Sequence, residues 1–371
     1  MLKFPEKFYW GASTSSYQVE GGIKNDWSES GEKYDAGICC DHYNRFEEDF
    51  DLAKSMNHNA HRFSIEWARI EPEEGKFDQK EIEHYRKVIL ALKERGMEPF
   101  VTLYHWTLPI WFVKKGGWLN KDAPEYFGKF VEKIVLEYKD LVKFWITLNE
   151  PNVYTFHSYF LGDWPSFKRS LSKTKLALRQ LSEAHKKAYI LIHRISPNTK
   201  VGIAYQKGES KISSHEWIYN FFKSIKDYQD FIGLNYYFSG VINFALNRIL
   251  LKKSIITDVG WEINPKGIYG ALKKLKQYNK PIYITENGLA DAKDRKREDF
   301  IINHLKWIYQ AIEEGIDVRG YLHWSLIDNF EWAKGFKPRF GLIEIDYENN
   351  LKRIPRPSSK VYAEICKNNA L

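Results

Sequence analysis

Two glutamates stand directly after short, mostly apolar runs of the chain. Glu150 follows a run over residues 144–148 and the amide Asn149, and Glu286 follows a run over residues 281–285. Two carboxyl groups, one protonated and one ionised, can together cleave an acetal: the protonated group acts as the acid and the ionised group as the nucleophile. Each glutamate alone could equally be half of a surface ion pair, because acids are common at strand ends. The interpretation therefore depends on the elements that carry the pair.

Short β-branched and aromatic runs alternate with amphipathic stretches along the whole chain, which predicts an α/β fold with parallel strands. The expected strands are Phe8–Ala12, Ala60–Ile65, Glu98–Leu103, Phe144–Leu148, Lys200–Ala204, Phe231–Leu234, Pro281–Thr285 and Gly320–Ser325. The expected helices are Tyr43–Met56, Gln79–Arg95, Pro124–Tyr138, Thr174–Ile195, Lys266–Tyr278, Glu298–Glu314 and Ser359–Lys367. No linker interrupts the series. We therefore predict one domain over residues 1–371, a (β/α)8 TIM barrel with shortened βα loops.

In such a barrel the chemistry gathers at the carboxyl ends of the strands. Eight polar and aromatic residues that could take part in chemistry lie near the carboxyl ends of the predicted strands. A carboxylate with a purely structural role would have no reason to be placed at those strand ends. The eight residues are Arg62, His105, Asn149, Glu150, Asn235, Tyr237, Glu286 and Trp324.

The motifs around these residues resemble glycoside hydrolase family 1, nearly from end to end. They are Phe8 to Ser13, Tyr17 to Gly21, His61 to Trp67, Tyr104 to Pro109, Asn149 to Pro151, Gly233 to Tyr237, Thr285 to Gly288, His323 to Leu326 and Asp328 to Trp332. So many motifs in the same order make chance resemblance negligible.

The resemblance implies a role for each matching residue. Glu150 would be the acid and base, and Glu286 the nucleophile, which Arg62, Asn235 and Tyr237 would hold in its ionised form. The substrate-binding residues would be Gln18, His105, Asn149, Trp324, Glu331 and Trp332. Outside that family, the same histidine and tryptophans would be read as core packing and Gln18 as a loop amide. Within it, we expect a retaining exo-β-glycosidase that hydrolyses terminal, unphosphorylated β-D-glucosides and β-D-galactosides through a covalent glycosyl-enzyme.

Single residues help to distinguish between alternative functions within the family. A non-catalytic sugar-binding relative would have lost one glutamate, and a thioglucosidase would lack the acid, yet both Glu150 and Glu286 are present. The 6-phospho-β-glycosidase subgroup resembles this chain in both catalytic positions, but it has Ser, Lys and Tyr where this chain has Glu331, Pro338 and Phe340. The acid Glu331 would repel a phosphate, which disfavours this alternative. β-Mannosidase and β-fucosidase specificity stays open, because the residues that contact hydroxyls are compatible with several epimers.

Composition excludes other classes of function. Lys and Arg number 56 against 48 Asp and Glu, a net charge of +8, but the cations are dispersed, which argues against nucleic-acid binding. Three cysteines give no disulfide framework or zinc spacing. The chain shows no secretory leader and no membrane-spanning run, so we expect a cytoplasmic location.

No cofactor and no metal are expected. The chain has neither a G-x-G-x-x-G loop nor a P-loop. His58 and His61 are three residues apart, a spacing that points side chains to opposite faces of a strand. The expected partner is a small-molecule or oligosaccharide β-glycoside, and association into a homo-oligomer stays open.

The chain departs from the family mainly in size. Family members usually exceed four hundred residues, whereas the connection over 205–230 and the segment after Pro151 are short here. Thr107 also stands where many relatives have Asp, as in archaeal-type members. We expect these differences to leave the cleft more open on the side that binds the leaving group and to leave the sugar-binding side unchanged.

Overall fold

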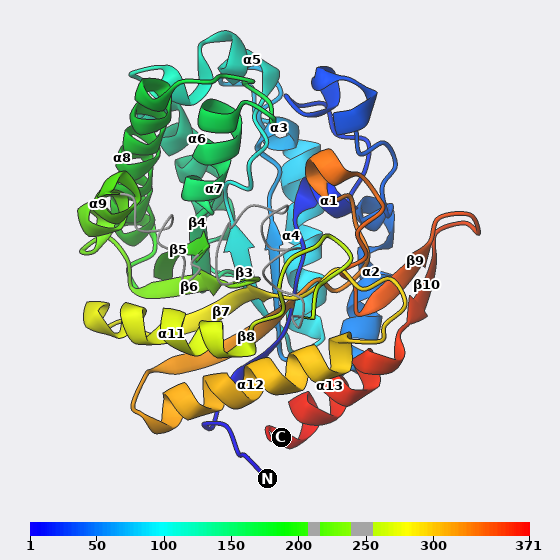
Figure 1. The fold of residues 1–371 in the computed structure, drawn as a ribbon. Helices are drawn as coiled ribbons and strands as arrows, with labels where there is room; N and C mark the ends of the chain where they lie inside the picture. The colour runs from blue at the N-terminus through cyan, green and yellow to red at the C-terminus, as the bar shows by residue number, and fades with distance from the viewer. Residues whose placement is uncertain (207–215, 239–254) are drawn as a thin grey trace.

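The computed structural model describes residues 1–206, 216–238 and 255–371, and its centre is a closed barrel of eight parallel strands in sequence order (Figure 1). The strands are β1 Tyr9–Ser13, β2 Ala60–Ser64, β3 Glu98–Thr102, β4 Phe144–Asn149, β5 Lys200–Gln206, β6 Phe231–Asn235, β7 Ile282–Asn287 and β8 Val318–Trp324. The predicted fold class is confirmed, with strand limits that differ from the expected ones by one or two residues.

Helices surround the barrel and return the chain from each strand to the next (Figure 1). They are α1 Ser16–Val19, α2 His42–Ser55, α3 Trp67–Ile70, α4 Gln79–Glu94, α5 Ile110–Lys114, α6 Ala123–Tyr138, α7 Pro151–Thr155, α8 Leu171–Ile195, α9 Glu216–Ile225, α11 Pro265–Leu275, α12 Arg297–Glu313 and α13 Pro357–Asn368. Their starts follow local chemistry. The Asp78 carboxylate accepts hydrogen bonds from the backbone at the start of α4, and Pro265 opens α11 behind the cap Asn264.

The amino-terminal end of the barrel is filled by aromatic rings. Phe100 and Phe144 stack with centroids 4.3 Å apart, and Tyr9 and Tyr283 each lie within 6 Å of Phe144. A barrel of this size has a packed interior and no pore. The opposite, carboxyl-terminal end is consequently the one where the strands can present polar side chains.

The strand ladders become irregular at that carboxyl-terminal end. The pairing register shifts between Ile146 and Asn149 on β4, between Leu234 and Asn235 on β6, and between Ile284 and Asn287 on β7. Bulges of this kind re-aim side chains and recur beside active sites. Each shift coincides with the predicted site residues of its strand.

A two-stranded antiparallel sheet of β9 Ile343–Asp346 and β10 Lys352–Pro355 follows the barrel and leads into α13. The sequence patterns do not predict it.

The two ends of the chain lie side by side in Figure 1, and the backbones of Leu2 and Leu371 exchange hydrogen bonds of 2.8 and 3.0 Å. In the described part of the chain, no helix is both long enough and apolar enough to cross a membrane.

Candidate active site

Glu286, the second-last residue of β7, has a partner on each carboxylate oxygen. The Arg62 guanidinium of β2 forms an ion pair with Oε1, and the Tyr237 hydroxyl donates to Oε2 at 2.6 Å. Arg62 is fully buried and Glu286 is 4% exposed. Because an opposite charge and a hydrogen bond both favour the ionised form of a carboxyl, this setting suits a carboxylate anion.

Glu150 follows the last residue of β4 and has a different setting. Its Oε1 accepts a hydrogen bond from the Asn235 amide at 2.8 Å, and the side chain has no ion-pair partner among the described residues. Burial, and then the negative charge of Glu286, raise the pKa of Glu150 well above its ordinary value. Glu150 is therefore suited to hold a proton at neutral pH.

A network of amides ties the two glutamates together. Asn149 Oδ1 accepts from Arg62 Nη2 at 2.7 Å and from Asn235 Nδ2 at 3.1 Å. The Asn235 carbonyl accepts from the Thr285 hydroxyl at 2.6 Å, which fixes the orientation of its amide. The network spans β2, β4, β6 and β7, so four strand ends are held in one arrangement.

His105, three residues after β3, joins this network from the side. Asn149 Nδ2 lies 3.1 Å from Nε2, so that ring nitrogen accepts and the proton belongs on Nδ1. Burial, with the charge of Arg62, lowers the pKa of His105 well below its ordinary value. Nδ1 is buried and finds no protein partner in the described structure, which leaves a donor available at the site.

Residues 325–332, here called the β8 arm, bring a third carboxylate to the site. Gln18 Nε2 is 3.5 Å from Glu331 Oε2 and donates to the backbone oxygen of Phe330 at 2.9 Å. Burial, opposed mainly by the charge of Lys334, raises the pKa of Glu331 to about 8. Burial, and then the negative charges of Glu286, Glu150 and Glu331, raise the pKa of the Tyr237 hydroxyl well above its ordinary value.

Aromatic rings line the same region. His105 is nearly parallel to Trp324, with centroids 6.1 Å apart, and to Trp332 at 6.0 Å. Trp332 also packs on Trp27 and Trp106, with centroids at 4.6 and 4.8 Å. Trp324 and Trp332 are 3% and 4% exposed, so both rings belong to the enclosed part of the site.

The structure brings together the predicted residues in one region. Asn149, Glu286 and Trp324 lie in the last two positions of their strands, while Arg62 lies two residues before the end of β2. Its guanidinium reaches the shared network nonetheless.

Several contacts were missed from the sequence. Thr102 accepts from Arg62 Nε at 3.0 Å, and Trp106 Nε1 donates to the backbone oxygen of Asn149 at 2.9 Å. Trp106 lies within the motif from Tyr104 to Pro109 and Thr102 two residues before it, but only the three-dimensional contacts show which groups they bind.

The two histidines at 58 and 61 lie away from this region. His58 packs its ring near Tyr362, at 5.4 Å between centroids, and His61 contacts the hydroxyl of Thr14 at 3.2 Å. Among the described residues no group of three or more His, Cys, Asp or Glu side chains is arranged to hold a metal ion.

Comparison with known proteins places this arrangement in a family. A family model described as "Glycosyl hydrolase family 1" matches residues 1–217 and 219–371. Beta-glucosidase A of Thermotoga maritima is 34% identical over 443 aligned positions, covering 100% of this chain and 99% of that protein. A beta-galactosidase of Sulfolobus acidocaldarius is 30% identical over 484 positions, covering 100% of this chain and 96% of that protein.

The solved structures agree with these matches. The beta-glycosidase from Pyrococcus horikoshii superposes with a TM-score of 0.90 at 38% identity, over 100% of this chain and 96% of that one. The chain belongs to glycosyl hydrolase family 1 and is a glycoside hydrolase of the β-glucosidase type.

Proposed function

We propose that the protein is a retaining exo-β-glycosidase in which Glu286 is the nucleophile and Glu150 the acid and base. The observation that carries this proposal is that the two carboxyl groups have opposite electrostatic environments. Glu286 is bonded by Arg62 and Tyr237, whereas burial and the charge of Glu286 favour the protonated form of Glu150. Environments that separate two carboxyls in this way assign one to attack and one to proton donation.

In the first step the Glu286 carboxylate attacks the anomeric carbon of a β-glycoside. The bond from that carbon to the leaving oxygen breaks, and Glu150 transfers its proton to this oxygen. The products are a glycosyl ester on Glu286 and a free alcohol. The negative charge of Glu286 is lost in the ester, so the largest electrostatic cause that raises the pKa of Glu150 disappears and burial remains.

In the second step Glu150, now a carboxylate, takes a proton from water, and the oxygen of that water attacks the anomeric carbon. The ester bond breaks, and Glu286 leaves as a carboxylate again bonded by Arg62 and Tyr237. The sugar is released with its original β configuration because two inversions cancel.

Sugar recognition is assigned to the groups around the two glutamates. Asn149 is proposed to bond the 2-hydroxyl, an interaction that strengthens as the ring becomes oxocarbenium-like. The carboxyl of Glu331 is proposed to bond the 4- and 6-hydroxyls, and the free Nδ1 proton of His105 another hydroxyl, with Trp324 and Trp332 against the ring. Gln18 already shares its amide among three acceptors, so its proposed part includes orienting Glu331.

We assign unphosphorylated β-D-glucosides as substrates, and β-D-galactosides beside them. The similarity to relatives named as a β-glucosidase and a β-galactosidase supports both sugars. A 6-phosphate would meet Glu331, Pro338 and Phe340, a set without a cation. Because the pKa of Glu331 is about 8, ionisation above that pH would add charge repulsion.

The test is a panel of nitrophenyl glycosides, α and β, phosphorylated and neutral, with glucose, galactose, mannose, fucose and xylose as the sugar. Proton NMR of early product identifies the first anomer released. Fastest cleavage of a neutral β-glucoside or β-galactoside, with the β anomer released first, agrees with the proposal. A first product of α configuration, or faster cleavage of a 6-phosphoglycoside, would refute it.

A further inference from the structure

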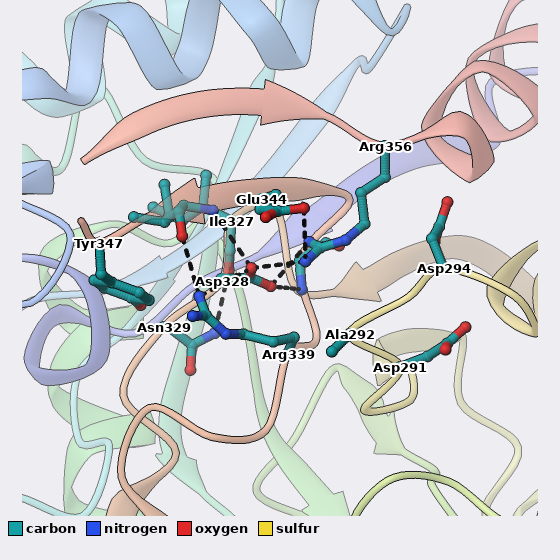
Figure 2. Close-up of polar contacts among 12 residues, drawn as sticks. Asp291, Ala292, Asp294, Ile327, Asp328, Asn329, Arg339, Glu344, Tyr347 and Arg356 are labelled. Carbon is teal, nitrogen blue, oxygen red and sulfur yellow. Dashed lines mark hydrogen bonds and ion pairs between the residues drawn. The ribbon is translucent and has the colours of Figure 1, made fainter. Parts of the chain in front are cut away.

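Asp328, within the β8 arm, is a fully buried carboxylate that accepts five hydrogen bonds, and Figure 2 shows it beside Arg356 and Arg339. Arg356 donates to both oxygens, at 3.0 and 2.9 Å, and Arg339 donates to Oδ2 at 3.3 Å. The backbone N–H groups of Gly341 and Ile345 complete the set at 2.9 and 3.4 Å. A buried carboxylate so fully satisfied is held in one position.

The donors come from segments that follow the arm in the chain. Arg356 caps the amino end of α13, and Ile345 belongs to β9. Gly341 packs so closely that a β-carbon there would collide with the backbone nitrogen of Asp328. The hairpin β9–β10 and the start of α13 therefore form a fixed support for the arm.

Glu331 follows Asp328 by three residues, and the two residues between them are hydrogen-bonded to Gln18. The Asn329 side chain accepts from Gln18 Nε2 at 3.1 Å and donates to Ser325 Oγ at 2.9 Å. The backbone of Phe330 both donates to Gln18 O at 3.0 Å and accepts from its amide. Gln18 therefore contacts Asn329, Phe330 and Glu331 in turn, so a shift of Asp328 can reach Glu331 along the backbone and through Gln18.

The charges favour such a movement when Asp328 is neutralised. Arg339 and Arg356 would then lose their shared counter-ion, because the other ion-pair partner of Arg356 within the described ranges, Glu344, is 3.6 Å away and its side chain is 44% exposed. Removing one member of a buried ion cluster leaves an uncompensated charge and is strongly destabilising. Part of that cost can be relieved by a shift of the arm.

We propose that Asp328, held by Arg356 and Arg339, is a positioning residue that sets Glu331 for recognition of the sugar's 4- and 6-hydroxyls. This inference rests on the proposed function, in which Glu331 bonds those hydroxyls. Asp328 does not touch the substrate, and its contribution is made through the β8 arm.

The experiment compares nitrophenyl β-D-glucoside with its 4-deoxy and 6-deoxy analogues. In the unmodified enzyme the loss of either hydroxyl should lower kcat/KM by roughly 10- to 100-fold, since a hydrogen bond to a charged or buried group is lost. In Asp328→Asn we expect kcat/KM on the glucoside to fall by a similar factor, with the penalty for deoxygenation shrinking to about 3-fold or less.

A matched control is Asp49→Asn. Asp49 of α2 is also fully buried, and it is paired at 2.8 Å with Arg353 of β10, so its loss disturbs the same hairpin without removing a contact of the Asp328 carboxylate. It should lose stability and keep the full deoxygenation penalty. If Asp328→Asn does not fold, Arg339→Gln removes one donor to Asp328 from a partly exposed side chain and should also reduce the penalty.

The outcomes separate the two proposals. A large deoxygenation penalty that persists unchanged in Asp328→Asn, or in Arg339→Gln as its substitute, overturns the positioning role and leaves the function intact. An equal reduction of the penalty in Asp49→Asn overturns the positioning role as well. Absence of any penalty in the unmodified enzyme overturns the assignment of Glu331, and absence of β-glucoside hydrolysis overturns the proposed substrate.

Discussion

Glu150 is the residue at which β4 gives way to α7, and its backbone lies in the left-handed region with φ of 42° and ψ of 58°. A non-glycine residue in this region costs about 1–3 kcal/mol and persists where the surrounding structure fixes it, often at functional sites. Here Pro151 begins the following helix, and Glu150 N donates to Ala204 O at 2.8 Å. The backbone is thereby fixed on both sides of the proposed acid.

The acid role of Glu150 predicts a dependence on the leaving group. In Glu150→Ala, kcat/KM on an alkyl β-glucoside should fall by about 10²- to 10⁴-fold, because the leaving alkoxide is no longer protonated. On a dinitrophenyl β-glucoside the fall should be less than about 10-fold, since this leaving group needs little protonation. Added azide should yield the β-glycosyl azide. Equal losses on the two substrates would contradict the role.

The raised pKa of Glu150 predicts the pH profile. Activity requires the protonated form, and burial together with Glu286 extends that form well above the ordinary range of a glutamate. The alkaline limb of kcat/KM should therefore follow the ionisation of Glu150 and disappear in Glu150→Gln. NMR titration of carboxyl-labelled enzyme should show a lower pKa for Glu150 once Glu286 is esterified. A pKa that does not fall would exclude charge coupling between the two.

At the scale of elements, the close packing of β7 against β8 requires a glycine at position 288. A β-carbon on Gly288, the residue after β7, would collide with the backbone oxygen of Trp324 at the end of β8. Backbone atoms of two adjacent strands cannot move apart without disturbing the ladder. This junction carries both Glu286 and Trp324, so packing and site geometry are linked there.

Gly288→Ala should consequently lower the free energy of unfolding by about 1–3 kcal/mol, as overpacking does, and lower kcat/KM as well. Gly128→Ala in α6 is the control, because its β-carbon would crowd the flexible end of Lys187 and meet Leu191 at an ordinary contact distance of 3.4 Å. Since alanine favours a helix over glycine, that variant should be neutral or more stable. Urea titrations and rates on one β-glucoside measure both effects, and an unaffected Gly288→Ala would disprove the link.

The sequence predicts the barrel because each strand and helix carries its own periodicity and the strand ends share one edge. It predicts the residues of the site for the same reason, through motifs at those ends. It does not reveal the hairpin β9–β10, whose strands have four residues each and mix charged with apolar side chains. Nor does it reveal the support of Asp328, because Arg356 is 28 residues away and nothing local marks the pairing.

At the scale of the whole molecule, the chain is shorter than its relatives. The alignment with the Thermotoga maritima enzyme extends over 443 positions, against 371 residues here, so that enzyme carries segments that this chain lacks. The predicted short connection between β5 and β6 includes residues 207–215, which lie outside the described part. Loops after the strands build the outer walls of barrel sites. We therefore keep the prediction of an open leaving-group side.

That prediction is tested by kcat/KM for one β-glycosyl group on a series of leaving groups, from methyl and nitrophenyl to cellobiose and flavonoids. With few contacts to remote parts of the substrate, KM should be high and the rates similar after correction for leaving-group pKa. A spread of several thousandfold, on the order of 5 kcal/mol, would require a well-formed binding site for the leaving group.

The central claim, that Glu286 forms a covalent bond to the sugar, is tested most directly by trapping. The enzyme is inactivated with 2,4-dinitrophenyl 2-deoxy-2-fluoro-β-D-glucoside, digested, and the labelled peptide is sequenced by mass spectrometry. One fluoroglucosyl group per chain, on Glu286, is the predicted result, with Glu286→Gln unlabelled, inactive and folded. A label on another residue, or near-normal turnover by Glu286→Gln, would contradict the account.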